Sequence, residues 1–248
     1  MPSKVLIQKI ASLSHKKFRD ELGLFIAEGD KLVKDLIYSS FTIEHLFVTQ
    51  GSALENIQHS QKEIISERGM KQVSGLKTPS HSFAVVQIPQ YELNVRALQN
   101  QLTIVLDAIQ DPGNLGTIIR LADWFGISSI ICSPNTADCY NPKVVQATMG
   151  AITRVKIHYQ PVPELLAYLP SSIPVYGTFL DGSNVYNSQL SSNGLIVMGS
   201  EGKGISREVE QLIQHRLHIP SFTNKKGSES LNVAIAAAIC CSEFRRRV

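Results

Sequence analysis

Short apolar runs and helically spaced apolar positions alternate along nearly the whole chain. In residues 3–13, apolar side chains recur at the spacing of one helix face, and β-rich runs follow. The elements predicted in this part are a helix over residues 3–13, strand Leu24–Ala27, helix Lys31–Tyr38, strand Phe41–Val48, helix Ala53–Glu67 and strand Phe83–Ile88. This alternation of helices and strands predicts a small α/β domain.

Proline and polar residues interrupt the pattern at Pro89–Asn94, which is the predicted linker. The alternation resumes after it, so the two domains are expected to be residues 1–94 and 95–248. Strands are predicted at Thr103–Asp107, Ser129–Cys132, Arg154–His158, Pro174–Thr178, Leu195–Gly199 and Leu217–Ile219. Helices are predicted at Asn114–Phe125, Lys143–Met149, Pro163–Leu169, Glu208–His215 and Leu231–Phe244.

The stretch LDAIQDPGNLGTIIRLADWFG, residues 106–126, is the most informative strand-turn-helix unit of the chain. The helix is expected to begin at about Asn114, with a buried stripe formed by Leu115, Ile118, Ile119, Ala122 and Phe125. Arg120 falls off that stripe, at the carboxyl end of a predicted strand, where open α/β sheets bind ligands. Two interpretations stay open: Arg120 pairs with Asp111 or Asp123 at the surface, or it serves a binding site.

A second stretch, LIVMGSEGKG, runs from a predicted strand into a glycine-rich loop that carries Glu201. Its glycines fit neither the Walker A loop nor the dinucleotide-binding pattern. On the residues alone, a structural tight turn is as well supported as a ligand-binding loop.

A third stretch follows Leu217–Pro220 through a lysine-containing loop to Ser228–Val233, which opens the last predicted helix. Ser228 or Ser230 could serve simply as the N-cap of that helix. Asn232 is harder to explain by helix formation, because asparagine is a poor helix former.

Composition is that of an ordinary soluble globular protein, with 43% hydrophobic and 18% charged residues. A net charge of +3 permits a nucleic-acid partner without requiring one. Lys16, Lys17 and Arg19 form a basic cluster around Phe18, either as a solvated helix end or as a phosphate-contacting patch. Four cysteines without metal-binding spacing, and the lack of a signal-type or membrane-spanning apolar run, predict a cytoplasmic protein that binds neither metal nor membrane.

Taken together and in this order, DPGNLGTIIRLA, VMGSEGKG and IP…SLNVA resemble the three motifs of the SpoU/TrmH family of RNA ribose 2′-O-methyltransferases. The resemblance covers most of residues 102–244, and residues 1–88 resemble the RNA-binding α/β domain that many members carry in front. It implies S-adenosylmethionine as the cofactor, an rRNA or tRNA substrate and a homodimer formed through the methyltransferase domain. It also implies a deep trefoil knot, whereas the pattern alone predicts an ordinary doubly wound sheet.

The resemblance further assigns site residues by position. Catalytic residues are expected to be Asn114, Arg120, Glu201, Ser230 and Asn232, and Ser228 is the alternative to Ser230 because the preceding loop is longer than in the family. Cofactor contacts are expected from Gly199, Ile219 and Leu231, with Thr178 as a looser candidate, and RNA contacts from Lys16, Lys17 and Arg19.

Methyl transfer to a ribose hydroxyl needs atoms held in line and one proton removed, and it needs no metal. The family is described with the first-motif arginine, here Arg120, as the proton acceptor. A guanidinium stays protonated far above neutral pH, so a phosphate-clamp role is at least as well supported. Glu201 is expected to orient Arg120, and Asn114 to position the ribose or hold the loops.

Two other function classes stay open. The chain could be an RNA-binding or assembly factor without catalysis, or a nucleotide-binding oxidoreductase or hydrolase that uses the GSEGKG loop. Titration with S-adenosylmethionine, NAD and ATP distinguishes these two classes from each other and from a methyltransferase.

Overall fold

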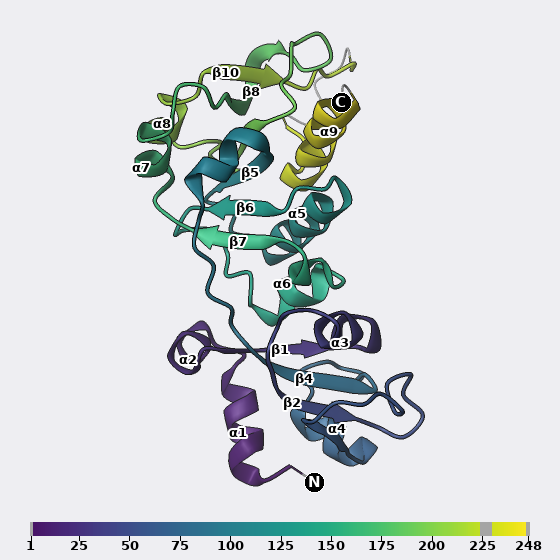
Figure 1. Ribbon diagram of the computed structural model, residues 1–248. Helices are drawn as coiled ribbons and strands as arrows, with labels where there is room; N and C mark the ends of the chain where they lie inside the picture. The colour runs from purple at the N-terminus through teal and green to yellow at the C-terminus, as the bar shows by residue number, and fades with distance from the viewer. Residues whose placement is uncertain (1, 224–229, 247–248) are drawn as a thin grey trace. The chain divides into compact units, whose positions relative to one another are not determined.

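The computed structural model describes residues 2–223 and 230–246, and the chain divides into two compact units. The first comprises residues 1–90 together with 138–154, and the second comprises residues 91–137 and 155–248 (Figure 1).

The first unit is built on a four-stranded sheet in the order β1-β4-β2-β3. Strand β4 pairs antiparallel with both β1 and β2, and β3 pairs parallel with β2. Its elements are α1 (Lys4–Ser12), α2 (Lys16–Leu22), β1 (Leu24–Glu28), α3 (Asp30–Ile37), β2 (Ile43–Val48), β3 (Lys62–Ile64), α4 (Glu67–Val73), β4 (Ser82–Gln87), α6 (Pro142–Ala147) and the 3-10 turn η2 (Ala151–Thr153). The sheet, α1 and α4 share one apolar core, which includes Ile10, Phe47, Met70 and Phe83.

The predicted helix Ala53–Glu67 is wrong. The chain makes turns there, followed by β3, and a helix begins only at Glu67, where the Ser66 hydroxyl caps it by accepting from the Gly69 amide at 3.2 Å. The Lys62 ammonium donates to the backbone carbonyls of Glu55 and Ile57, at 2.8 and 2.6 Å. Those carbonyls are therefore satisfied in an irregular loop, and no helix is needed to pair them.

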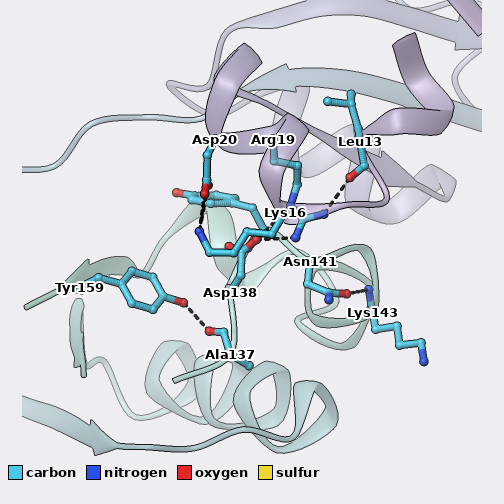
Figure 2. A network of polar contacts seen from close by, with 10 residues as sticks. Leu13, Lys16, Arg19, Asp20, Ala137, Asp138, Asn141, Lys143 and Tyr159 are labelled. Atoms are coloured by element: carbon cyan, nitrogen blue, oxygen red, sulfur yellow. Dashed lines mark hydrogen bonds and ion pairs between the residues drawn. The ribbon is translucent and has the colours of Figure 1, made fainter. Parts of the chain in front are cut away.

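Arg19 lies inside this unit, not on an exposed basic surface. Only 1% of it is exposed, and its guanidinium donates to the Asp138 carboxylate at 2.6 and 2.9 Å and to the Leu13 carbonyl at 2.8 Å (Figure 2). The expected three-residue basic surface is wrong at this position, because a fully paired, buried guanidinium is not available to phosphate. Lys16 and Lys17 are exposed as expected.

The second unit is a six-stranded, entirely parallel sheet in the order β10-β8-β9-β5-β6-β7. Its elements are η1 (Val95–Asn100), β5 (Leu102–Asp107), α5 (Pro112–Trp124), β6 (Ser129–Cys132), β7 (Lys156–Tyr159), α7 (Val162–Ala167), β8 (Val175–Asn184), β9 (Gly194–Gly199), α8 (Arg207–Glu210), β10 (His215–His218) and α9 (Val233–Arg246). Helices α5 and α9 lie side by side, while η1, α7 and α8 share another apolar core with β5 and β9 (Figure 1). The predicted α/β class is confirmed, and the knot stays a prediction.

The strand order places the site. From β5 the chain builds outward through β6 and β7, while β8, β9 and β10 lie on the other side of β5. Strands β5 and β9 are therefore neighbours where the order reverses, which is where parallel α/β sheets bind ligands. Both of the glycine-containing loops singled out in the sequence leave the carboxyl ends of these two strands.

The predicted helix Glu208–His215 is much shorter in the structure. It ends at Glu210, and residues from His215 onward pair with β8 as strand β10. The helical spacing was misleading here because Leu212 and Ile213 pack against the apolar core from the irregular segment between α8 and β10, and not from a helix.

Candidate active site

The first site loop leaves β5 and enters α5 two residues earlier than expected. Asp111, not Asn114, is the N-cap, because its carboxylate accepts from the Asn114 amide at 2.8 Å and Pro112 starts the helix. Asn114 therefore sits in the first turn, where its side-chain amide is left for other partners.

Asn114, Glu201 and Asn232 come together as one hydrogen-bonded cluster. The Glu201 carboxylate oxygen Oε1 accepts from Asn114 Nδ2 at 3.0 Å, Asn232 Nδ2 at 2.6 Å and the Val233 amide at 3.4 Å. Asn232 Nδ2 also donates to Asn114 Oδ1 at 2.9 Å. One carboxylate thus ties together the starts of α5 and α9 and the loop after β9, from three distant parts of the sequence.

Asn232 also supplies the cap of α9. Its side-chain oxygen accepts from the amides of Ala234 and Ile235, at 3.0 and 3.3 Å. The capping role that the sequence left open for Ser228 or Ser230 therefore falls to Asn232. Ser230 is exposed just before α9, and Ser228 lies outside the described residues.

Arg120 is exposed on α5, and it forms no hydrogen bond or ion pair with any residue that the structure describes. The expected orientation of Arg120 by Glu201 is not seen among the described residues, where Glu201 Oε1 accepts from the two asparagines and the Val233 amide. The expected surface pairing of Arg120 with Asp111 or Asp123 is not made either. The guanidinium is therefore available to an anionic ligand.

The loop that carries Glu201 is a tight turn between Ser200 and Gly204. The two residues exchange backbone hydrogen bonds of 3.0 and 2.8 Å, and Gly204 has φ +70°. A Cβ on Gly199 would lie 2.2 Å from the Gly204 carbonyl carbon and the Ile205 nitrogen, so only glycine fits there. The interpretation as a structural tight turn is confirmed, and ligand binding by this loop stays a prediction.

A residue that the sequence analysis missed holds the far end of this loop. Asp107, a buried carboxylate at the end of β5, accepts from the Ser206 amide at 2.7 Å. The available signal was a charged residue that closes an otherwise apolar strand, since such a group needs a partner when buried.

The residues expected to hold the cofactor lie on β8, at the ends of β9 and β10, and before α9. Thr178 is on β8, and its hydroxyl donates to the Val197 carbonyl at 3.4 Å. Gly199 ends β9, and Ile219 directly follows β10. Leu231 precedes α9 and is 48% exposed. Parallel strands put the ends of β9 and β10 at one edge of the sheet, which suits backbone contacts to a single ligand.

A parallel sheet with a polar cluster at its switch point, and an arginine without a partner among the described residues on the first helix after it, agree with the class that the sequence motifs implied, an RNA methyltransferase. Residues 101–242 match the SpoU rRNA Methylase family, and residues 4–84 match the MRM3-like substrate binding domain. The chain belongs to the SpoU rRNA methylase family. The family, fold class and methyltransferase activity predicted from the sequence are thereby confirmed.

Three relatives cover nearly the whole chain. The 23S rRNA (guanosine(2553)-2′-O)-methyltransferase RlmP of Bacillus subtilis is 29% identical over 94% of this chain and 93% of its own. A structure described as an RNA methyltransferase of the TrmH family from Porphyromonas gingivalis is 40% identical, with a TM-score of 0.90 and full coverage of both chains. The AdoMet-bound rRNA methyltransferase from Sinorhizobium meliloti is 27% identical, with a TM-score of 0.84 over 100% of this chain and 97% of its own.

Proposed function

We propose that this chain transfers a methyl group from S-adenosylmethionine to a ribose 2′-hydroxyl of ribosomal RNA. The observation that carries the proposal is the Asn114–Glu201–Asn232 cluster at the sheet's switch point, with the Arg120 guanidinium, which has no partner among the described residues, on the same helix as Asn114. Ribosomal RNA is favoured over tRNA because the Bacillus subtilis relative acts on 23S rRNA and the Sinorhizobium meliloti relative is an rRNA methyltransferase.

Gly199, Ile219 and Leu231 would hold the cofactor through backbone groups, with Thr178 beside them. When bound, S-adenosylmethionine supplies an activated methyl group on a sulfonium. The AdoMet-bound Sinorhizobium meliloti relative supports this cofactor. The chain's own contribution is to hold the loops after β9 and before α9 in one arrangement, which the Glu201 bonds to Asn232 and Val233 achieve. Ser230, exposed at that junction, would face the same site.

Arg120 would act as a phosphate clamp. A guanidinium presents a planar fork of charged donors that matches a phosphate. Held by that contact, the ribose hydroxyl is aligned for attack, while its proton passes to phosphate or water. Asn114, fixed by Glu201, would position the ribose.

The described part of the chain offers no cluster of residues that could hold a metal ion, and it contains no helix long and apolar enough to cross a membrane. The first unit would bind RNA through exposed lysines such as Lys16 and Lys17. We also propose that the protein is cytoplasmic and forms a homodimer. The dimer is supported by Trp124 and Ile235, 84% and 52% exposed on the contacting helices α5 and α9.

The test combines cofactor binding with product mapping. Purified protein is titrated with S-adenosylmethionine by calorimetry and then incubated with unmodified 23S rRNA or with tRNA transcribed in vitro. We expect binding of the cofactor, and 2′-O-methylation at a defined position of the rRNA. Cofactor binding without methylation of either RNA would instead support a binding or assembly factor, and binding of NAD or ATP would support the nucleotide-enzyme alternative.

A further inference from the structure

A cavity of about 550 Å³ lies directly beside the cluster in the second unit. The loops after β5, β6 and β9 form it. It is lined by Asn114 and Glu201 of the cluster, by residues 108–111, by Asn135, by Ser200, Gly202 and Lys203, and by Val233. Thr178, Gly199, Ile219 and Leu231 do not line it. The space next to the cluster is therefore distinct from the residues expected to hold the cofactor, and its volume is within the range of small-ligand sites.

Three of the lining residues have unused polar side chains. Gln110, Asn135 and Lys203 are exposed, and within residues 2–223 and 230–246 their side chains form no hydrogen bond or ion pair. Asn114 and Glu201, by contrast, are bound to each other and to Asn232. The cavity thus offers two amides and one ammonium that are free to bind a ligand.

The loops that carry these groups are fixed at the backbone. Ser133 accepts from the Ala108 amide at 2.8 Å, and the Ile109 carbonyl accepts from the Ala137 amide at 2.8 Å. Ala108 has φ +58°, a conformation that alanine rarely adopts and that the neighbouring bonds maintain. The backbone that carries Gln110 and Asn135 therefore loses little entropy when a ligand binds.

The larger hollow of this unit, about 840 Å³ beside β8 and β10, offers no free charge of this kind. Its Arg216 is paired with Asp181 and Glu210, at 2.5 and 2.6 Å, and lies 3.6 Å from the Phe179 ring centroid. The cavity at the cluster is therefore the better candidate for an anionic, hydrogen-bonding ligand.

We infer that this cavity binds the acceptor nucleotide of the RNA in an unstacked conformation, with Gln110 and Asn135 on the base and Lys203 on an adjacent phosphate. The inference rests on the proposed function and deepens it. Side-chain amides carry both donors and an acceptor, which suits the edge of a nucleobase, and lysine binds phosphate as a point charge. Sequence-specific RNA recognition uses bases that are splayed out of the stack in this way.

Two matched controls lie at the opposite edge of the same sheet. Arg96 and Asn100 belong to η1, which precedes the amino end of β5, and both are exposed. Arg96→Ala removes one surface charge, as Lys203→Ala does, and Asn100→Ala removes one surface amide, as Asn135→Ala does. Thermal unfolding and the affinity for S-adenosylmethionine should be unchanged in all four variants, because none of these side chains supports the fold.

The first measurement is binding of the full-length protein to unmodified 23S rRNA across a series of salt concentrations. Lys203→Ala should reduce the salt slope by about one, the value for one lost phosphate contact. Asn135→Ala should weaken binding about tenfold at every salt concentration, as expected for one lost base contact. The two controls should behave like the unaltered protein, and equal effects of pocket and control variants would overturn the inference.

The second measurement uses an RNA oligonucleotide that spans the methylated position, and the same oligonucleotide with an abasic ribose there. The unaltered protein should have a KM about tenfold lower for the intact RNA, and Asn135→Ala or Gln110→Ala should abolish that difference. A preference for the intact RNA that survives in the double variant Gln110→Ala/Asn135→Ala would overturn the inference. If no RNA is methylated at all, the proposed function fails, and the binding measurement still decides whether this cavity holds RNA.

Discussion

At the scale of single residues, the free guanidinium of Arg120 contrasts with the fully bonded Glu201. Replacement of Arg120 by alanine should leave the fold and cofactor affinity nearly unchanged, because the side chain has no partner among the described residues. Methyl transfer should fall by roughly two to four decades, the usual contribution of a positioned electrostatic group. Arg120→Lys should recover little, since an ammonium lacks the planar fork. Single-turnover methylation and a calorimetric cofactor titration measure both effects, with Arg96→Ala as the control. Loss of cofactor affinity together with activity would show that Arg120 is structural.

Asn232 has two functions that one substitution can separate. Asn232→Asp keeps an oxygen that can cap α9, but it cannot donate to Glu201 and places a second carboxylate beside it. We expect this variant to lose most of its activity. Asn232→Ser keeps the cap without the repulsion, and Asn232→Ala should additionally cost about 1 kcal/mol of stability through the lost cap. Urea unfolding and methylation assays distinguish the two effects. An Asp variant as active as the unaltered protein would contradict a role for the donor.

The sequence identifies site residues that belong to local motifs, but it does not show which residues they contact when the partners are far apart in the chain. Asn114, Glu201 and Asn232 were identified through three motifs, and they do converge. Their mutual bonding was not foreseen, because nothing in the sequence shows which of several donors reaches a given carboxylate. For the same reason Glu201 was assigned to Arg120. Arg19 was grouped with two lysines, since its partner Asp138 is 119 positions away.

At the scale of elements, the buried ion pair of Arg19 and Asp138 holds helix α2 to the segment that begins at Asp138. The side chains of Arg19 and Asp138 are only 2% and 13% exposed. Arg19→Ala should therefore destabilise the protein by about 3–5 kcal/mol, because it leaves a buried carboxylate without its partner. The double variant Lys16→Ala/Lys17→Ala should have nearly unchanged stability and a flatter salt dependence of RNA binding. Denaturant unfolding and RNA titration of both variants test this division. A stable Arg19→Ala protein with weakened RNA binding would restore the sequence-based assignment.

Helix α9 buries two adjacent thiols, and the consequence is measurable. Burial raises the pKa of both Cys240 and Cys241 from 9.0 to about 12, so both are neutral thiols in the folded protein near pH 8.5. Alkylation by iodoacetamide, which requires thiolate, should be very slow until the protein is unfolded. Because folding favours the protonated form, this contribution to stability is complete below pH 9 and is lost as the pH rises from 9 toward 12. Rapid labelling of either cysteine in the native state would contradict the burial of this helix face.

Elements stabilised by burial of apolar side chains were predicted correctly, and a segment stabilised by polar contacts to distant residues was not. The central strands β5, β6 and β9 of the parallel sheet were found because they are buried on both faces, which leaves a nearly continuous apolar run. The segment 53–67 was misassigned because the chain at its start binds a distant residue: the Ser52 hydroxyl and the Ala53 backbone amide donate to the Asp30 carboxylate, at 3.3 and 3.2 Å. Spacing alone does not reveal such contacts.

At the scale of the whole molecule, the proposed dimer is best tested in the full chain. A fragment beginning near Arg96 would lose the packing partners of residues 138–154, which belong to the first unit. Within that unit the ring centroids of Tyr140 and Phe25 lie 4.9 Å apart, and Asp138 forms an ion pair with Arg19. Removal of residues 1–90 would expose those groups, so an altered association state of the fragment would not be informative about the native interface.

Substitution on α5 and α9 avoids this difficulty. Trp124→Glu with Ile235→Glu should convert a dimer into a folded monomer at micromolar concentration, because it places charge on a surface whose large apolar side chains are now 84% and 52% exposed. Tyr168→Glu is the matched control, since Tyr168 is 88% exposed at the end of α7 and belongs to neither helix. Sedimentation velocity and cofactor titration of the three proteins separate loss of association from loss of fold. A monomeric unaltered chain, or a dimer that survives both charges, would contradict an interface on these two helices.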